Sequence, residues 1–495
     1  MSIEIGKKTN IPSYPNIQKD VLITYPEPPK DLTQGKFMDL IKYFGPGAIL
    51  ASITIGSGEV FFASRGGAIF GYAILWCFML GAVMKGVQTY TANRYITLTG
   101  EHPMNRWAYI FPGPKGWFPL LMGILSIFCF PFWQGGISSL LGTLLSKNFA
   151  FFSTQIWASL LILGAFSLFM AGGYDAMEKA QTAIVGTMVV ALLVAVVAAK
   201  PDWLQVLIGS FIPTIPSYEP WIAAKYPSIA GRPVWVEVVT YLGAIGGGTY
   251  DYIGYTGLMR EKGWGVLGRE DLDQIRDYLD GLQEGQRIPL SEDPEEVRKG
   301  LAWAKAPFMD NLVSFVLLVI FTIGFMVNGA VILNTAQLVP ANNDMLTHQA
   351  KFLTQIHPML VYLYYLAVFC ALFGTIYGCY MGYVYTTYET FAPVSRKIKE
   401  LGFKGIKLPV SLYIALGGLV AVWTGLNPVA IITPASILGG VLTGGIWCLA
   451  MYWTDRKMMP KSYQLGTAAS VLLIISGIVM TILGIIAVLQ YLKVL

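Results

Sequence analysis

The stretch ASITIGSGEVFF, residues 51–62, interrupts what otherwise reads as a membrane-spanning helix. Gly56 and Gly58 flank Ser57, and a carboxylate, Glu59, follows directly. Glycine inside a helix costs about 0.5–1 kcal/mol relative to alanine, so the stretch predicts local unwinding. In a bilayer, the backbone groups that unwinding frees are tolerated only where they are buried in protein or line a wet cavity. The stretch is therefore a candidate binding site.

A second interruption of the same kind lies in YLGAIGGGTYDYIGY, residues 241–255. Three consecutive glycines end at Gly248 and are followed by Asp251. Paired glycine-interrupted segments in the two halves of a chain are the best sequence pointer to a transporter site. A charge near the bilayer centre costs at least about 2.5–3.5 kcal/mol, so such residues usually face a cavity or a partner. Asp251 could equally cap a new half-helix, and both roles stay open at this point.

The composition places these interruptions in a polytopic, all-α membrane protein. Of 495 residues, 55% are hydrophobic and only 13% are charged, which exceeds what a soluble core needs. About eleven apolar segments are long enough to cross a bilayer. In a five-plus-five inverted repeat with one extra helix, the first and sixth segments, which carry the interruptions, each begin a repeat. The expected spans are 41–67, 71–96, 117–145, 154–171, 177–199, 235–258, 310–335, 357–388, 408–425, 429–453 and 464–491.

The polar segments define the expected organisation and topology. Basic residues concentrate in the connections on the side of the N-terminus, which predicts a cell-membrane protein with its N-terminus inside and its C-terminus outside. The net charge of +5 follows from these connections, so membrane lipid and a small ion or solute are expected partners and nucleic acid is not. The expected units are a cytosolic tail (1–40), a first five-helix repeat (41–199), an extracytoplasmic loop (200–234), a second repeat (235–453) with a cytosolic insertion (259–309), and an eleventh helix with the C-terminus (454–495).

Three motifs that often mark catalytic or metal sites are missing from this sequence. The five cysteines form no C-x-x-C pair, and no H-E-x-x-H or G-x-S-x-G is present. We therefore expect no enzyme and no cofactor, apart from a divalent cation as substrate.

Two further spans contribute candidate residues of a permeation pathway. Gln134 is the only strong polar side chain in the stretch FCFPFWQGG, residues 128–136. In the eighth span, Tyr377, Tyr380 and Tyr383 recur at helical spacing and share a face. Thr375 adds a hydroxyl that leaves a sodium site open. Packing within the bundle explains the same residues equally well.

Several motifs together resemble the Nramp family of divalent-metal transporters. They are GPGAILASITIGSGE (45–59), RYITLTGEHP (94–103), GGYDAMEKAQ (172–181), PDWLQVLIGSFIPTIP (201–216) and DRKMMP (455–460). The resemblance covers most of residues 40–490. It implies a LeuT-type fold of eleven or twelve helices with a metal site where the first and sixth helices unwind. It also implies a secondary transporter that moves a divalent metal cation by alternating access.

The ligands that this family implies are only partly present. Its Asp-Pro-Gly-Asn motif falls on Gly56, Ser57, Gly58 and Glu59, and its Met-Pro-His motif falls on Gly247, Gly248 and Thr249. Without the thioether, an all-oxygen site remains, which suits a hard cation. Its expected members are Glu59 as tentative metal ligand, Asp251, and the backbone carbonyls near Ile53 and Ala244.

Two alternatives keep the fold and change the function. Three adjacent glycines vacate volume, so the cargo could be a small organic solute such as an amino acid or amine, held by free backbone groups. The chain could also be a non-transporting receptor whose insertion, residues 259–309, captures a soluble partner. Residues 117–152 contain no Asp or Glu, whereas the family carries carboxylates there, so the coupling ion stays open.

Overall fold

The structure of the chain is a computed structural model that describes residues 22–172, 174–282, 286–340 and 346–491. Residues 1–21 and 492–495 of the predicted terminal segments lie outside the described residues. The side chain of Ser57, a predicted site residue, is not described either. The regular structure of the described residues is helical, apart from one isolated bridge between Ile23 and Leu290.

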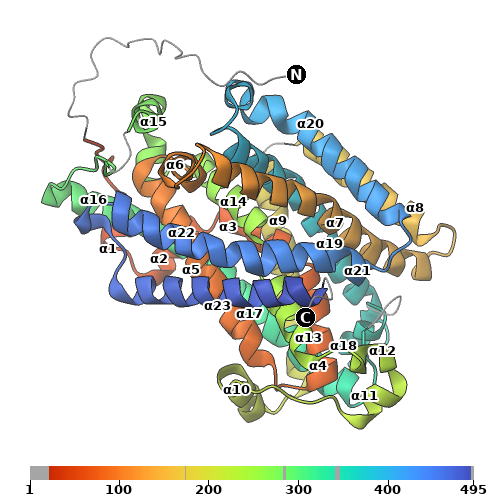
Figure 1. Cartoon of the computed structure of the whole chain (residues 1–495). Coiled ribbons are helices and arrows are strands. Elements are labelled where there is room, and N and C mark those ends of the chain that lie inside the picture. The colour runs from red at the N-terminus through yellow and green to blue at the C-terminus, as the bar shows by residue number, and fades with distance from the viewer. Residues whose placement is uncertain (1–21, 173, 283–285, 341–345, 492–495) are drawn as a thin grey trace.

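Long helices form one bundle (Figure 1), and two of its spans are broken as predicted. The first consists of α3 (Pro46–Thr54), a π-helical segment (Ser57–Ala63) and α4 (Ser64–Phe70), and the sixth of α13 (Val234–Ala244) and α14 (Thr249–Leu258). The others are α5 (Leu75–Thr99), α7 (Trp117–Asn148), α8 (Thr154–Ala171), α9 (Tyr174–Ala199), α17 (Lys305–Asn328), α19 (Leu360–Phe391), α20 (Arg396–Trp423), α21 (Pro428–Ala435) with α22 (Thr443–Met458), and α23 (Thr467–Tyr491).

Short helices lie in the connections and cover the two ends of the bundle. At one end lie α1, α2, α6, α15 and α16, and at the opposite end lie α10, α11, α12 and α18 (Figure 1). Their bounds are α1 (Lys30–Gln34), α2 (Phe37–Leu40), α6 (Pro103–Ile110), α10 (Trp203–Phe211), α11 (Pro220–Lys225), α12 (Pro227–Ala230), α15 (Leu272–Asp280), α16 (Pro294–Trp303) and α18 (Lys351–Thr354).

Within the described residues, eight helices are long and apolar enough to cross a membrane, or nine with the bent pair α3 and α4. The remaining two of the eleven expected spans, 71–96 and 235–258, correspond to α5 and to the broken pair α13 and α14. These helices are less apolar because α5 carries buried polar side chains, among them Lys85 and Asn93, and because the sixth span is divided at its glycines.

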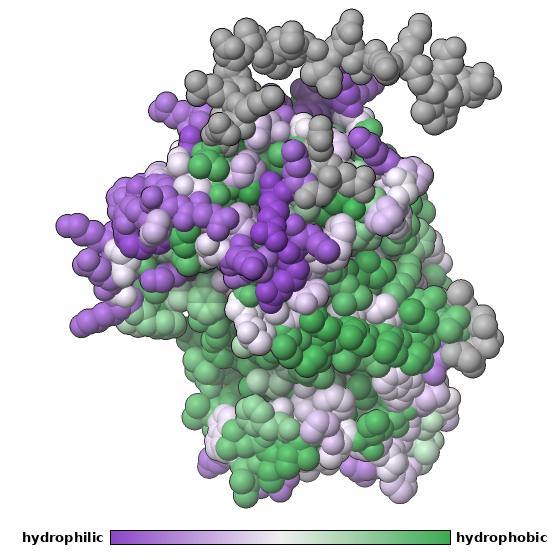
Figure 2. All heavy atoms as spheres, turned by 60° about the vertical axis from the view of Figure 1, so that its left-hand side comes forward, coloured by the Kyte–Doolittle hydropathy of each residue, from purple (hydrophilic) through white to green (hydrophobic). Residues whose placement is uncertain are grey.

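The outer surface of the bundle matches a lipid environment. Val471, Ile475, Ile478, Ile482 and Ile485 follow a helical spacing on α23, and each is about half exposed. A helix stripe of this kind is paired with a core in a soluble protein, so its exposure indicates contact with lipid. Figure 2 shows a broad band of hydrophobic surface below an end where hydrophilic residues gather. The chain is a multi-pass membrane protein.

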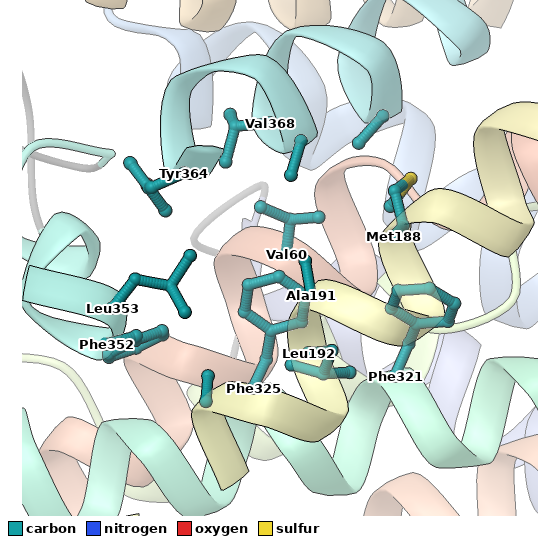
Figure 3. A pocket seen from close by; sticks show the side chains of 13 residues that line it. Val60, Met188, Ala191, Leu192, Phe321, Phe325, Phe352, Leu353, Tyr364 and Val368 are labelled. Atoms are coloured by element: carbon teal, nitrogen blue, oxygen red, sulfur yellow. The ribbon is translucent and has the colours of Figure 1, made fainter. Parts of the chain in front are cut away.

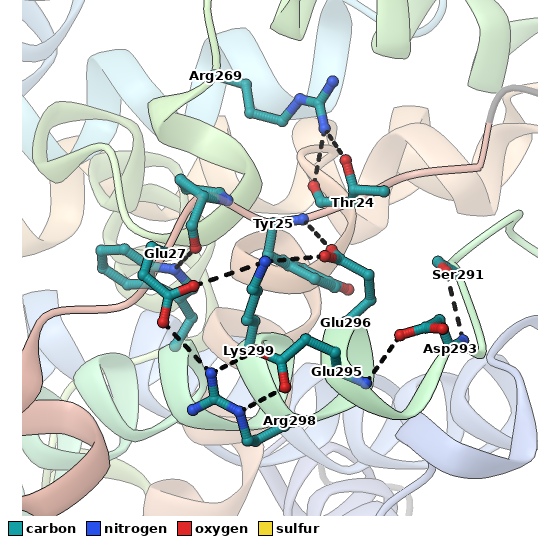
Figure 4. A network of polar contacts seen from close by, with 12 residues as sticks. Thr24, Tyr25, Glu27, Arg269, Ser291, Asp293, Glu295, Glu296, Arg298 and Lys299 are labelled. Atoms are coloured by element: carbon teal, nitrogen blue, oxygen red, sulfur yellow. Dashed lines mark hydrogen bonds and ion pairs between the residues drawn. The ribbon is translucent and has the colours of Figure 1, made fainter.

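Residues after position 21 pack on the polar insertion at one end of the bundle. The Tyr25 backbone N–H donates to Glu296 Oε2 at 2.7 Å, and Arg269 donates to the Thr24 carbonyl at 2.9 Å (Figure 4). Nearby, the Trp303 indole donates to the Pro26 carbonyl at 2.8 Å. The described part of the expected tail is thus attached to the insertion by polar contacts.

Candidate functional site

The first break lets the chain pass very close to its neighbours. Helix α3 ends at Thr54, and the axis turns by 44° before it continues into α4. A Cβ atom on Gly56 would lie 2.5 Å from Thr375 Oγ1, and one on Gly58 would lie 2.4 Å from the Ala244 carbonyl oxygen. Both distances are far inside van der Waals contact, so glycine is required for the first break to pack on α19 and on the sixth break.

The sixth break is a turn of two left-handed glycines. Gly246 has φ +72° and Gly247 has φ +80°, a backbone conformation that favours glycine. The turn leaves carbonyl groups at the end of α13 without helical partners. Three carbonyl oxygens, those of Gly243, Ile245 and Gly247, accept hydrogen bonds from a single ammonium, Lys85 Nζ, at 2.9, 2.5 and 2.7 Å.

Asp251 caps a half-helix, one of the two roles that its sequence position suggests, and its role in binding stays a prediction. Its Oδ2 accepts a hydrogen bond from the Gly248 N–H at 2.7 Å and so caps the N-terminus of α14. Its Oδ1 is buried and has no hydrogen-bond partner among the described residues. The side chain lines a small enclosed cavity between the two breaks. One oxygen of Asp251 thus holds the helix while the other is available to a ligand.

The cavity is lined by residues of the two broken spans and by residues of two further helices, α7 and α19. Its volume of ≈ 10 Å³ is about what the centre of one water molecule needs. Asp251 is the only carboxylate in this lining as described. The lining residues are Ile53, Thr54, Trp133, Ile137, Ala244, Gly247, Asp251, Thr375, Cys379 and Tyr383.

Glu59 lies beside this cavity but does not line it. The side chain is 0% exposed, and its Oε1 accepts a hydrogen bond from the Gly246 N–H at 2.9 Å. Its Oε2 has no partner in the described part of the chain. Glu59 therefore joins the first break to the sixth, with one oxygen unused. Its role as a metal ligand stays a prediction.

The structure brings together part of the predicted site. Ile53, Ala244, Gly247, Asp251, Thr375 and Tyr383 share the cavity, whereas Gly56, Gly58 and Gly248 shape the breaks around it. Thr249 lies at the start of α14, where its Oγ1 accepts from Gln88 Nε2 at 3.2 Å.

Three predicted pathway residues lie outside the cavity lining. Gln134 Nε2 donates to the Ile376 carbonyl at 3.4 Å, and the Tyr380 hydroxyl donates to the Ile162 carbonyl at 3.1 Å. Tyr377 is partly exposed and close to Gly172, where a Cβ would lie 3.2 Å from its hydroxyl. These contacts are those of packing between helices.

Two important residues are absent from the sequence-based prediction. Trp133 immediately precedes Gln134, and its indole nitrogen is buried without a partner among the described side chains. Lys85 is the one charged residue of the apolar run 75–93, and an intramembrane charge is itself a signal of function.

Ion pairs link helices between the breaks and each end of the bundle. Toward α11 and α12, Arg65 of α4 pairs with Glu237 of α13 at 3.3 Å through two hydrogen bonds, and also donates to the Pro340 carbonyl. Toward α15 and α16, Arg260 pairs with Glu389 of α19 at 2.8 Å. Each end of the bundle thus carries an ion pair that links two helices around the candidate site.

A larger cavity nearby has a different character. Its volume is ≈ 40 Å³, and it is lined by residues of α9, α17, α18 and α19 together with Val60 (Figure 3). Its lining is apolar apart from Tyr364, whose hydroxyl donates to the Leu346 carbonyl at 2.6 Å. A charged cargo would find no ligand among these described side chains.

Comparison with known proteins agrees with the motifs of the sequence. The profile of the family described as Natural resistance-associated macrophage protein-like, Nramp, matches residues 47–245. The metal transporter Nramp6.2 of Populus trichocarpa is 26% identical over 180 residues, which are 35% of this chain and 32% of that protein. The chain is a divergent relative of the Nramp family. The matched segment spans only about a third of this plant relative.

Solved structures extend the likeness of this Nramp relative to nearly the whole chain. A manganese transporter of Eremococcus coleocola superposes with a TM-score of 0.64 at 13% identity, covering 94% of this chain and 89% of that one. MhsT in complex with L-phenylalanine superposes with a TM-score of 0.51 at 15% identity, covering 90% and 97%. At these identities the likeness concerns the fold, which is the predicted LeuT type.

The packing of the breaks explains why two positions of the Nramp ligand motifs, Gly56 and Gly247, have no side chain in this sequence. A side chain at Gly56 would collide with Thr375, so this position has no room for the aspartate that the family places there. A Cβ on Gly247 would lie 2.7 Å from Asp251 Oδ2. The Asp251 carboxylate thus fills the space beside the position where the family has its thioether. No group of three His, Cys, Asp or Glu residues that could hold a metal occurs in the described ranges.

Proposed function

We propose that this Nramp relative is a secondary transporter that moves a divalent cation across the membrane by alternating access. The observation that carries the proposal is the carboxylate of Asp251, which lines the cavity between the broken spans and has one buried oxygen, Oδ1, without a hydrogen-bond partner among the described residues. A buried charged group of this kind is costly unless it meets a cation. Backbone carbonyls of Ile53 and Ala244 would add oxygen ligands, which hard cations prefer.

The polar contacts at the two ends of the bundle support alternating access as the mechanism. The Arg65–Glu237 pair would open for exchange on one side, and the Arg260–Glu389 pair would open on the other. We place the protein in the cell membrane, surrounded by lipid, with the N-terminus inside and the C-terminus outside. Uptake of Mn²⁺, Mg²⁺ and Ca²⁺ into proteoliposomes tests the proposal. Uptake that does not exceed that of protein-free liposomes for any of the three ions would contradict it.

The substitution Glu59→Gln tests the contribution of the Glu59 charge, because it removes the charge and keeps the hydrogen bond to Gly246. Glutamine keeps an oxygen that can accept from the Gly246 N–H, so the two breaks should stay joined. Loss of the buried negative charge should lower cation uptake about tenfold, in line with the 10–100-fold that residues around a metal typically contribute. The measurement is the initial rate of uptake into proteoliposomes. Glu270→Gln, at an exposed position, is the control, and uptake by Glu59→Gln at the wild-type rate would remove Glu59 from the site.

A second candidate is a small organic amine or amino acid as cargo. Two aromatic residues, Trp133 and Tyr383, line the cavity, and Tyr250 packs against both, with ring centroids 6.3 Å from Trp133 and 5.9 Å from Tyr383. Aromatic faces attract organic cations, and the free indole N–H of Trp133 suits a carboxylate. A single carboxylate, Asp251, would balance one ammonium. These features favour an organic cargo over a metal on this side of the cavity.

Trp133→Phe distinguishes the two kinds of cargo. Phenylalanine keeps an aromatic ring but removes the indole N–H. The lost hydrogen bond to a carboxylate of the cargo would be worth about 1.5–3 kcal/mol, because one partner is charged. Uptake of an amino acid should therefore fall about tenfold or more, while uptake of a divalent cation should stay near the wild-type rate. Competition between Mn²⁺ and a panel of amino acids and amines is the measurement. Equal loss of both cargoes would show that Trp133 acts through packing and would remove the support for organic recognition.

A further inference from the structure

Lys85 places a cation of the protein itself inside the sixth break. The side chain comes from α5 and is 1% exposed. Its three N–H bonds each have a carbonyl acceptor, on Gly243, Ile245 and Gly247, within 2.5–2.9 Å. A backbone-carbonyl cage of this kind is what a free monovalent cation binds when it loses its water.

The surroundings of this ammonium are those of a cation site. Glu59 and Asp251 both interact with Lys85 electrostatically. Tyr252 donates to the Gly246 carbonyl at 2.5 Å, so the fourth carbonyl of the turn is also used. The site therefore holds two carboxylates and one ammonium. The carbonyls of residues 243, 245, 246 and 247 each accept a hydrogen bond.

We propose that Lys85 is a tethered cation that replaces a free monovalent ion at the sixth break. Its ammonium holds the unwound turn in the shape that the cavity needs and offsets one of the two buried negative charges. The second charge is then left for the cargo. The inference deepens the proposed function, because it states which positive charge the protein supplies itself and which it must bind.

A structural cap of α13 would use the same hydrogen bonds, so the test must distinguish the two roles. Lys85→Ala retains Cβ and removes a segment of the size of n-propylammonium. We expect the variant to take up cation at least about tenfold more slowly than wild type, since hydrogen bonds of a charged donor are lost. Millimolar n-propylammonium should restore most of the rate and the melting temperature, whereas n-propanol, a neutral molecule of similar size, should not.

The controls use the full chain in detergent and in liposomes. Lys305→Ala removes another lysine that donates to a carbonyl, that of Leu32 at 2.8 Å, and should show no response to n-propylammonium. Wild-type uptake should be unchanged when choline replaces Na⁺ and K⁺. If Lys85→Ala does not fold, Lys85→Gln, which keeps a neutral donor, takes its place and should fold but transport at least about tenfold more slowly.

Several results would overturn the tethered-cation proposal. They are uptake by either Lys85 variant at the wild-type rate, equal rescue by n-propylammonium and n-propanol, no rescue of folded Lys85→Ala, and a requirement of the wild type for Na⁺ or K⁺. If the wild type transports no cation at all, the proposed function fails, but rescue of the melting temperature of Lys85→Ala still tests the tethered cation.

Discussion

Asp251→Asn should lower cation uptake about a hundredfold while leaving the protein folded. Asparagine has nearly the same shape and keeps an oxygen that can accept from the Gly248 N–H, so the cap of α14 survives. The variant loses the one negative charge that lines the cavity in the described structure. Residues that merely support a metal ligand contribute 10–100-fold, and a direct ligand should contribute at least the upper value. The initial rate of Mn²⁺ uptake into proteoliposomes measures the effect.

Asp273→Asn is the matched control for this variant, because the Asp273 side chain is 95% exposed on α15. It should transport at the wild-type rate. Melting temperatures of both variants close to that of wild type would confirm that the loss is functional. If Asp251→Asn transports at more than about a third of the wild-type rate, Asp251 is not the charged ligand of the cation.

Arg65→Met should destabilise the protein by about 3–5 kcal/mol, the range measured when one partner of a buried ion pair is removed. The side chains of Arg65 and Glu237 are only 7% and 6% exposed. Methionine fills the volume of Arg65 but leaves Glu237 with Tyr241 at 2.6 Å and the exposed Arg232 at 3.7 Å. With only the exposed Arg232 as a counter-charge, Glu237 should loosen the contact between α4 and α13, and a fall in melting temperature would report it.

The double variant Arg65→Met with Glu237→Gln distinguishes charge from packing. It should recover part of the lost stability, because no buried charge is left without a partner. Arg396→Met is a control, since the Arg396–Glu400 pair is 89% and 63% exposed and exposed pairs are worth about 0–1 kcal/mol. If Arg65→Met and Arg396→Met melt at the same temperature, the contact between α4 and α13 does not hold that end closed.

The sequence predicts the helix breaks well because the cause is local. Gly246 and Gly247 permit a left-handed turn, and Gly58 permits the approach to the Ala244 carbonyl. Each of these requirements is a property of the residue itself. The all-α fold with its broken first and sixth spans follows from such local signals together with the apolar segments, and the likeness to solved transporters confirms it.

The side chains that contact the two breaks are harder to predict from the sequence, because these contacts depend on how helices distant in the chain face one another. Lys85 is 158 residues away from Gly243, and nothing in its own segment names the carbonyls that it binds. Glu59 directly follows Gly58 and lies close to Gly56, so the sequence predicts that its carboxylate lies in the cavity. The rotation of the π-helical segment points it to Gly246 instead, whereas Asp251 reaches the cavity. Such rotations are set by packing of the whole bundle.

The proposed cation site lies between the two breaks, beside Asp251. The most direct measurement is an anomalous difference map, at the manganese absorption edge, from crystals of the full chain grown with Mn²⁺. We predict a peak in the cavity lined by Ile53, Ala244 and Asp251 in the wild type and none in Asp251→Asn. A wild-type map with no peak in this cavity, at a Mn²⁺ concentration that supports uptake, would contradict the account.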